Sequence, residues 1–142
     1  MERIARRQQR IWVLQALFEA NFRNLDASQT LANLIEREPD AAKADYTQKL
    51  IPLVIENLEE IDSKIEQFSK DWRIDRMAKV DLCILRMAIA EMLYIDDVAD
   101  SVAINEALEI AKEYSTEKSA KFINGILGAF SKSLEEKQEE IK

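Results

Sequence analysis

Helix-breaking residues are scarce in this chain: among 142 residues it has two glycines, Gly125 and Gly128, and two prolines, Pro39 and Pro52. Glycine and proline supply most of the backbone conformations that tight turns require, and both are unfavourable inside helices. Apolar residues recur at intervals of three or four along most of the sequence, which is the spacing of one face of an α-helix. These two features together predict an all-α protein without β-strands.

Capping residues and prolines divide the sequence into six expected helical segments, which are about seven helices if the chain breaks near Pro52. Asp26 or Ser28 is placed to cap the second helix, and Ser115 or Thr116 to cap the last. Because proline removes a backbone donor, a kink at Pro52 or a break just before it is expected. The helices are expected at residues 2–23, 29–38, 41–69, 75–95, 102–114 and from 117 onward, with a charged extension over 131–142 that frays.

Length and composition limit the class of protein. With 142 residues, of which 47% are hydrophobic, the chain is long enough for one domain with a core. No apolar run approaches the ~20 residues of a membrane span, and the N-terminus lacks the cleavage site of a signal peptide. Cys83 is the single cysteine, and histidine, phosphate-binding loops and nucleophile motifs are absent from the sequence. We therefore expect a cytoplasmic protein that is not an enzyme and uses no metal or cofactor.

Positive charge is concentrated at the start of the chain. Residues 1–12 contain Arg3, Arg6, Arg7 and Arg10 against one glutamate, a local charge of +3 in a chain whose net charge is −7. On a helix these four guanidinium groups fall within an arc of about 100°. Arginine pairs with phosphate through two hydrogen bonds and stacks on unpaired bases, which makes this face a candidate RNA-binding surface. A solvated face that only maintains solubility is the alternative.

Four segments carry a family resemblance: ARRQQRIWVLQALFEANF (5–22), WRIDRMAKVDLCILRMAIAEML (72–93), VAINEALEIAK (102–112) and EKSAKFINGIL (117–127). In order and separation they resemble the bacterial transcription antitermination factor NusB, over residues 5 to 130. The resemblance implies an all-α, NusB-like fold. It further implies one domain over residues 1–142, made of two small helical bundles, 1–70 and 71–142.

The resemblance also implies a function, which is binding of the single-stranded boxA element of nascent RNA jointly with the ribosomal protein NusE. The pair joins the elongating RNA polymerase complex and suppresses premature termination, notably in ribosomal RNA operons. The positions that match the family's RNA contacts are Arg3, Arg6, Arg7, Arg10, Lys121 and Phe122. The positions that match its NusE-facing surface are Phe18, Asp75 and Asp81.

Some of these positions have a second interpretation. Lys118 stands where relatives commonly carry an acidic residue; it is expected to strengthen attraction for RNA, although it and Lys121 are also explained as surface lysines. Phe122 continues an apolar stripe with Ile126 and Phe130, so the core is its favoured place, with an edge that could stack on a base. The alternative function is a helical adaptor that binds only a protein partner, and a homodimer through the NusE-facing surface is an alternative assembly.

Three further residues receive structural interpretations. Asn105 and Asn124 lie in apolar helical faces, so we expect each to satisfy a buried polar partner. Gly125 is expected to let the N-terminal helix approach the last core helix closely, which would bring Lys121 and Phe122 near the arginines. The same packing account is the hypothesis for Gly128.

Overall fold

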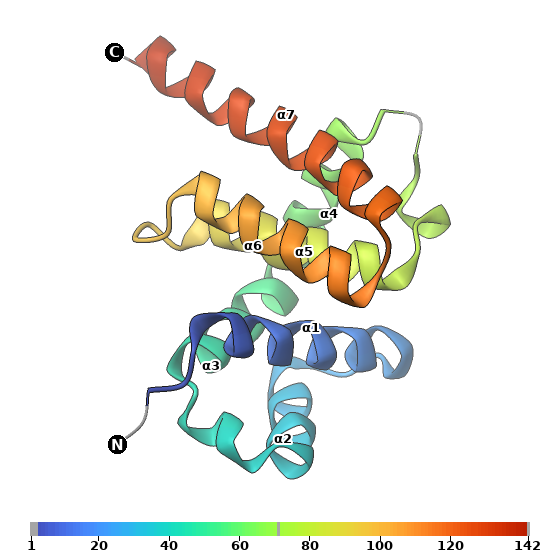
Figure 1. The fold of residues 1–142 in the computed structure, drawn as a ribbon, viewed down its shortest axis with the longest axis vertical. Helices are drawn as coiled ribbons and strands as arrows, with labels where there is room; N and C mark the ends of the chain where they lie inside the picture. Colours follow the sequence, from blue (N-terminus) through green and yellow to red (C-terminus); the bar gives the residue numbers. More distant parts are fainter. Residues whose placement is uncertain (1–2, 71, 142) are drawn as a thin grey trace. The chain divides into compact units, whose positions relative to one another are not determined.

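The computed structural model describes residues 3–70 and 72–141. Over this part of the chain it contains seven α-helices, two short 3-10 helices and no strand (Figure 1), which confirms the predicted all-α class. The chain divides into two compact units, Met1–Leu58 and Glu59–Lys142. Each unit has its own helices and its own buried residues.

The N-terminal unit contains α1 (Arg6–Arg23), α2 (Ala27–Arg37), η1 (Pro39–Lys43) and α3 (Asp45–Glu56). Helices α1, α2 and α3 pack against one another, and their shared core includes Val13, Leu17, Leu34, Leu50 and Val54. The cap of α2 is Asp26, whose Oδ1 accepts a hydrogen bond from the Gln29 N–H at 2.8 Å, while Gln29 Oε1 accepts one from the Asp26 N–H. This reciprocal pair is a capping box.

The long helix expected over residues 41–69 is divided, but not where Pro52 predicted. Pro52 lies inside α3, and the interruption falls at Asn57, before α4 (Leu58–Phe68). The Asn57 side-chain amide donates to the Leu53 carbonyl at 2.9 Å. Because proline removes one donor only, α3 continues past it. The helix stops where a side-chain amide satisfies a carbonyl near its end, so the expected break before Pro52 is wrong.

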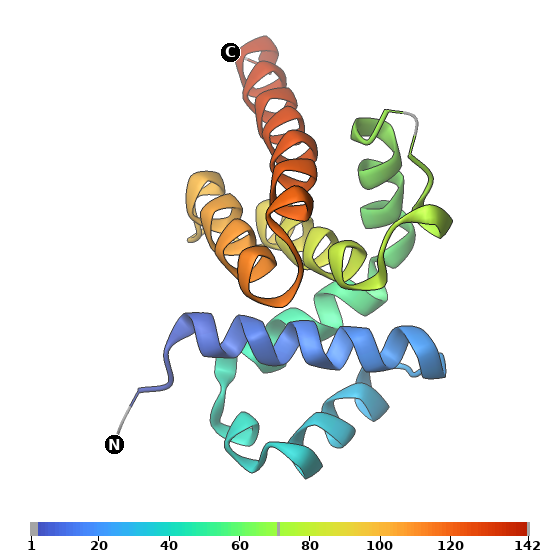
Figure 2. The ribbon, with the colours of Figure 1, turned by 45° about the vertical axis from the view of Figure 1, so that its right-hand side comes forward.

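The C-terminal unit contains α4, η2 (Ile74–Arg76), α5 (Lys79–Tyr94), α6 (Asp100–Tyr114) and α7 (Glu117–Ile141). Helix α5 is central, with α6 and α7 packed against it and against each other (Figure 2). Every residue of α5 from position 81 to position 91 is buried. Helix α7 includes the charged extension as far as Ile141, so the segment expected to fray is helical.

Helix α4 belongs to the C-terminal unit, so the boundary between the units falls after Leu58 rather than after residue 70. The Arg86 guanidinium on α5 donates from Nε to Asp62 Oδ1 and from Nη2 to Asp62 Oδ2, both at 2.8 Å. The Phe68 ring lies 5.7 Å from the Phe130 ring of α7. These contacts join residues far apart in sequence and hold α4 to α5 and α7, so the division in the structure lies earlier than the one that the resemblance implied.

Burial makes the thiol of Cys83 unreactive. Cys83 lies on α5 and is 1% exposed, and desolvation raises the pKa of its thiol from 9.0 to about 11, with the positive charges of Arg86 and Lys79 acting in the opposite direction. At neutral pH the side chain is therefore a protonated, apolar core residue.

Among the described residues no helix has the length and hydrophobicity to cross a membrane. Among the same residues, no three His, Cys, Asp or Glu side chains form a group that could hold a metal ion.

Candidate nucleic-acid interface

The start of α1 presents arginines to solvent in the N-terminal unit. Arg3, Arg6 and Arg7 are exposed. The Arg6 guanidinium carbon lies 3.9 Å from the centroid of the Tyr46 ring on α3, a cation–π contact. Tyr46 is itself buried, at 7% exposure, so it is a fixed platform. Arg6 is therefore oriented before any ligand binds, which reduces the conformational entropy lost on binding.

Arg10 does not share this exposed surface. It is 2% exposed, and its guanidinium carbon lies 5.5 Å from the same Tyr46 ring. The sequence placed Arg10 on one arc with the other arginines, but one edge of that arc faces the packed side of α1. In this structure the guanidinium of Arg10 is therefore not accessible to a phosphate, in contrast to the exposed surface that the sequence predicted for it.

Gln9 is a supporting residue that the sequence analysis did not identify. Helix α3 begins after Ala44, which provides no side-chain cap. Gln9 Oε1 instead accepts hydrogen bonds from the backbone N–H groups of Tyr46 at 2.9 Å and Thr47 at 3.3 Å. Gln9 Nε2 donates to the Ile4 carbonyl at 3.1 Å. The Gln9 side chain thus caps α3 and also holds the backbone at Ile4, between Arg3 and Arg6. The one signal for this role in the sequence is that Ala44, just before α3, has no side chain that could cap the helix.

Replacing Gln9 with alanine is expected to lower the free energy of unfolding by about 1–2 kcal/mol, because two N–H groups at the start of α3 lose their acceptor. Urea unfolding followed by circular dichroism measures the effect. Gln15→Ala, at an exposed position of the same helix, is the matched control. Equal stability of the two variants would contradict the capping role.

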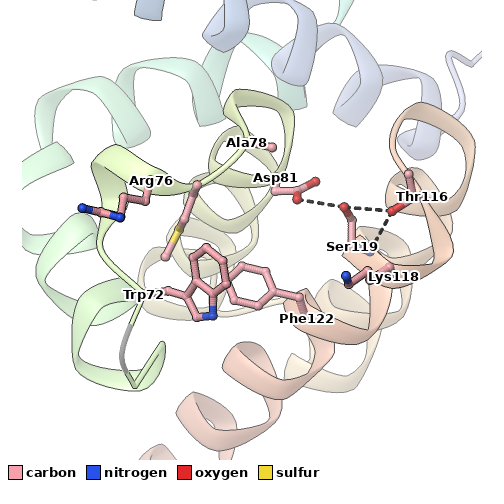
Figure 3. Close-up of a pocket in the computed structure, with 9 residues that line it drawn as sticks. Trp72, Arg76, Ala78, Asp81, Thr116, Lys118, Ser119 and Phe122 are labelled. Atoms are coloured by element: carbon pink, nitrogen blue, oxygen red, sulfur yellow. Dashed lines mark hydrogen bonds between the residues drawn. The ribbon is translucent and has the colours of Figure 1, made fainter.

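The C-terminal unit has a pocket of about 260 Å³ between the segment that precedes α5 and the start of α7 (Figure 3). Trp72, Met77 and Phe122 provide its apolar lining, and Lys118, Thr116 and Ser119 lie on the α7 side. The Trp72 ring is 5.9 Å from the Phe122 ring in a T-shaped arrangement, and Trp72 remains 54% exposed. The pocket therefore combines an exposed aromatic ring with a cation.

The predicted cations of α7 are accessible, and Phe122 is only partly buried. Lys118 and Lys121 are both exposed, and Phe122 is half-buried with its ring against Trp72. Lys121, Phe122 and Gly125 also line a second hollow of about 380 Å³ that shares Trp72 with the first. The core interpretation of Phe122 is thus incomplete, since its ring lines both hollows.

Asp81, expected on the NusE-facing surface, is 6% exposed. Its Oδ1 accepts a hydrogen bond from Ser115 Oγ and its Oδ2 accepts one from Ser119 Oγ, each at 2.8 Å. The first turn of α5 points this carboxylate at the connection between α6 and α7. Asp81 therefore holds the turn that carries Lys118, and little of its carboxylate is exposed to solvent.

The other two residues expected to face NusE are accessible. Asp75 is exposed, with Oδ1 at 3.5 Å from Arg73 Nε. Phe18 is 37% exposed and its ring lies 5.0 Å from that of Phe22, which is 63% exposed. Phe22 follows Phe18 by one helical turn. The two rings form an exposed aromatic pair on α1 of which the sequence analysis identified one member.

The expectation of buried partners for the two asparagines is wrong. Asn105, Asn124 and Gly125 are all exposed, so neither asparagine meets a buried partner. A Cβ atom added at Gly125 or Gly128 would have no neighbouring heavy atom within 4 Å among the described residues, so packing within the C-terminal unit requires glycine at neither position; the approach of the N-terminal helix to Gly125 stays a prediction. The hydrophobic pattern placed these positions within apolar faces, whereas packing turns them toward solvent.

The helical units, with exposed arginines on one and a cationic aromatic pocket on the other, define a small all-α protein with candidate nucleic-acid-binding surfaces. A family model described as "NusB family" matches residues 7–132. The chain belongs to the NusB family, as the sequence resemblance predicted.

Relatives with the same name agree with this assignment. The transcription antitermination protein NusB of Listeria monocytogenes serotype 4a (strain HCC23) is 48% identical over 122 residues, which are 86% of this chain and 92% of the relative. That of Thermoanaerobacter sp. (strain X514) is 43% identical over 125 residues, 88% of this chain and 89% of the relative. Both relatives are named for transcription antitermination and not for a catalytic activity.

Two solved structures extend the likeness to the fold. T. maritima NusB matches with a TM-score of 0.83 and 37% identity, over 92% of this chain and 93% of that one. A crystal structure of the antitermination factors NusB and NusE in complex with dsRNA matches with a TM-score of 0.80 and 27% identity, over 90% of this chain and 96% of that one.

Proposed function

We propose that this protein is a transcription antitermination factor that binds boxA-type single-stranded RNA together with NusE. It acts in the cytoplasm on the elongating RNA polymerase complex, notably on ribosomal RNA operons. Membership of the NusB family supports the function, and the similar structure with NusE and dsRNA supports both kinds of partner. The observation that carries the proposal is the exposed start of α1, where Arg6 is held on Tyr46 in a protein of net charge −7.

The RNA contacts come from exposed cations on each unit. Arg3, Arg6 and Arg7 serve on the N-terminal unit, and Lys118 and Lys121 on the C-terminal unit, all of them exposed. Five contacts to a single strand predict a slope of about −3.5 in log K against log salt concentration, at about −0.7 per contact. Because the rest of the protein is acidic, RNA is attracted to these surfaces and repelled elsewhere.

The protein contact involves the aromatic pair Phe18 and Phe22. Two adjacent, exposed aromatic side chains are the kind of patch that marks a protein interface, and Phe18 is at a position that matches the family's NusE-facing surface. Asp75 provides an exposed carboxylate for a basic partner. The same aromatic pair supports the second candidate, a helical adaptor without sequence-specific RNA binding, and it is the surface through which a homodimer would form.

Fluorescence anisotropy of a labelled boxA-type RNA, with and without purified NusE, tests this function. We expect tighter binding to boxA than to a scrambled RNA of the same composition, a further gain in affinity with NusE, and weaker binding at the higher of two salt concentrations. Binding of NusE without any preference for boxA would instead establish the adaptor.

Size-exclusion chromatography with light scattering reports whether the protein self-associates. The variant Phe22→Ala tests whether the aromatic pair mediates this self-association.

A further inference from the structure

We infer that the pocket at Trp72 binds one unpaired nucleobase of the RNA, with Trp72 as its stacking platform. This inference rests on the proposed RNA-binding function and assigns a residue that the sequence analysis did not consider. It concerns only the C-terminal unit, to which all the described lining residues of the pocket belong.

Trp72 is exposed to solvent, and its backbone is hydrogen-bonded to Ser69. More than half of its surface is exposed, at 54%, although burial of so large an apolar side chain would normally stabilise a fold. Its carbonyl accepts a hydrogen bond from Ser69 Oγ at 2.6 Å, and its N–H donates to the Ser69 carbonyl at 3.3 Å. The edge contact with Phe122 further limits the rotation of the ring. A held, exposed ring is a suitable base platform because little order must be gained when a base stacks on it.

The charges around Trp72 favour a nucleotide over an apolar peptide. Arg76 and Lys118 line the pocket, and Lys70 and Lys121 line the adjacent hollow that shares Trp72 and Phe122. Among the described residues of both linings Asp81 is the one acidic side chain, and it is buried and accepts hydrogen bonds from Ser115 and Ser119. Four cations around an aromatic pair, in a protein of net charge −7, match a base with its flanking phosphates.

The size and polar wall of the pocket also fit a base. Its volume of about 260 Å³ lies below the roughly 300 Å³ at which pockets for drug-sized ligands begin. Opposite the aromatic rings, Thr116 and Ser119 place hydroxyl groups at the pocket wall (Figure 3). The hydroxyl proton of Ser119 goes to Asp81 Oδ2 and that of Thr116 goes to Ser119 Oγ, so the Thr116 oxygen can accept a hydrogen bond from the polar edge of a base while the face of the base stacks on an aromatic ring.

Tryptophan fluorescence tests the stacking directly, because the two tryptophans differ in exposure. Trp12 is buried on α1 at 7% exposure, whereas Trp72 is exposed. In a Trp12→Phe variant Trp72 is the single tryptophan, and we expect boxA-type RNA to quench its emission with the same midpoint as the anisotropy titration. In Trp72→Phe, which retains Trp12, we expect no quenching.

Affinity measurements on paired protein and RNA variants identify the base. Trp72→Ala is expected to weaken binding of boxA-type RNA about tenfold and Trp72→Phe much less, since phenylalanine still stacks. In a series of RNAs with one abasic nucleotide each, one abasic position should remove the difference between wild type and Trp72→Ala. Thermal unfolding of each variant confirms that the protein remains folded.

The outcomes separate this inference from the proposed function. RNA binding with unchanged Trp72 emission and unchanged affinity of Trp72→Ala would overturn the pocket assignment and leave the proposed function standing. Quenching by NusE alone, without quenching by RNA, would overturn it in favour of a protein contact. Absence of any RNA binding by the wild type would overturn both.

Discussion

Replacing Arg6 and Arg7 together with alanine is expected to weaken the binding of boxA-type RNA by about 100-fold. In the proposed complex each guanidinium contributes a charge-assisted hydrogen bond to phosphate, and a loss of about 1.4 kcal/mol per contact corresponds to tenfold in affinity. The salt slope should fall in magnitude by about 1.4, because two of the phosphate contacts are lost. Anisotropy titrations at several salt concentrations measure both quantities.

Arg23→Ala is the matched control for this double variant. Arg23 lies at the opposite end of α1, where its Nη1 donates to Glu19 Oε1 at 2.9 Å, and Glu19 keeps a second partner in Arg37. Its replacement should leave both RNA affinity and salt slope nearly unchanged. An equal loss in the control and in the double variant would indicate attraction by net charge alone and would refute a specific contact at the start of α1.

Replacing Asp62 with alanine is expected to lower the free energy of unfolding by about 3 kcal/mol. The change removes both acceptors of the bidentate hydrogen bonds from Arg86, whose side chain is 10% exposed. Breaking a buried ion pair from one side leaves a charge with too little compensation and lowers stability by about 3–5 kcal/mol. We expect the lower end of this 3–5 kcal/mol range because the Asp62 side chain remains 23% exposed, so solvent already screens part of the interaction. Thermal unfolding should show a decrease of about 10 °C in Tm.

Two variants make this stability prediction specific. Glu66→Ala removes an exposed carboxylate from the same helix and should change stability by less than about 0.5 kcal/mol. A double replacement, Asp62→Leu with Arg86→Met, removes both charges and should recover most of the loss, because neither partner is then left desolvated. If the double variant is less stable than Asp62→Ala, the ion pair is not the source of the effect.

Features that depend on neighbouring residues in the chain were predictable. The near absence of glycine and proline and the spacing of apolar residues predicted the all-α class, and Asp26, one of the two caps expected for the second helix, is its cap. The cluster of arginines in residues 1–12 predicted the exposed cations at Arg3, Arg6 and Arg7. Order and spacing of four motifs predicted the family.

Features that depend on which helix face meets a neighbour were not predictable. Arg10 and Arg6 are one helical turn apart, yet Arg10 is buried and Arg6 is exposed beside Tyr46. Asp81 turned inward toward Ser115 and Ser119, while Asn124 turned outward. Periodicity indicates that a helix has two faces, but it does not place the edge between them.

The sequence by itself determined the helical class, the family and the concentration of positive charge at one end, because each follows from local propensity or from residue order. Only the tertiary structure decided which side chains became surfaces. Three contacts show this, because each joins residues that are distant in sequence. They are the cap that Gln9 provides to α3, the Asp62–Arg86 ion pair, and the ring contact of the exposed Trp72 with Phe122. Such contacts depend on the relative orientation of packed helices, which the whole core sets and no single segment encodes.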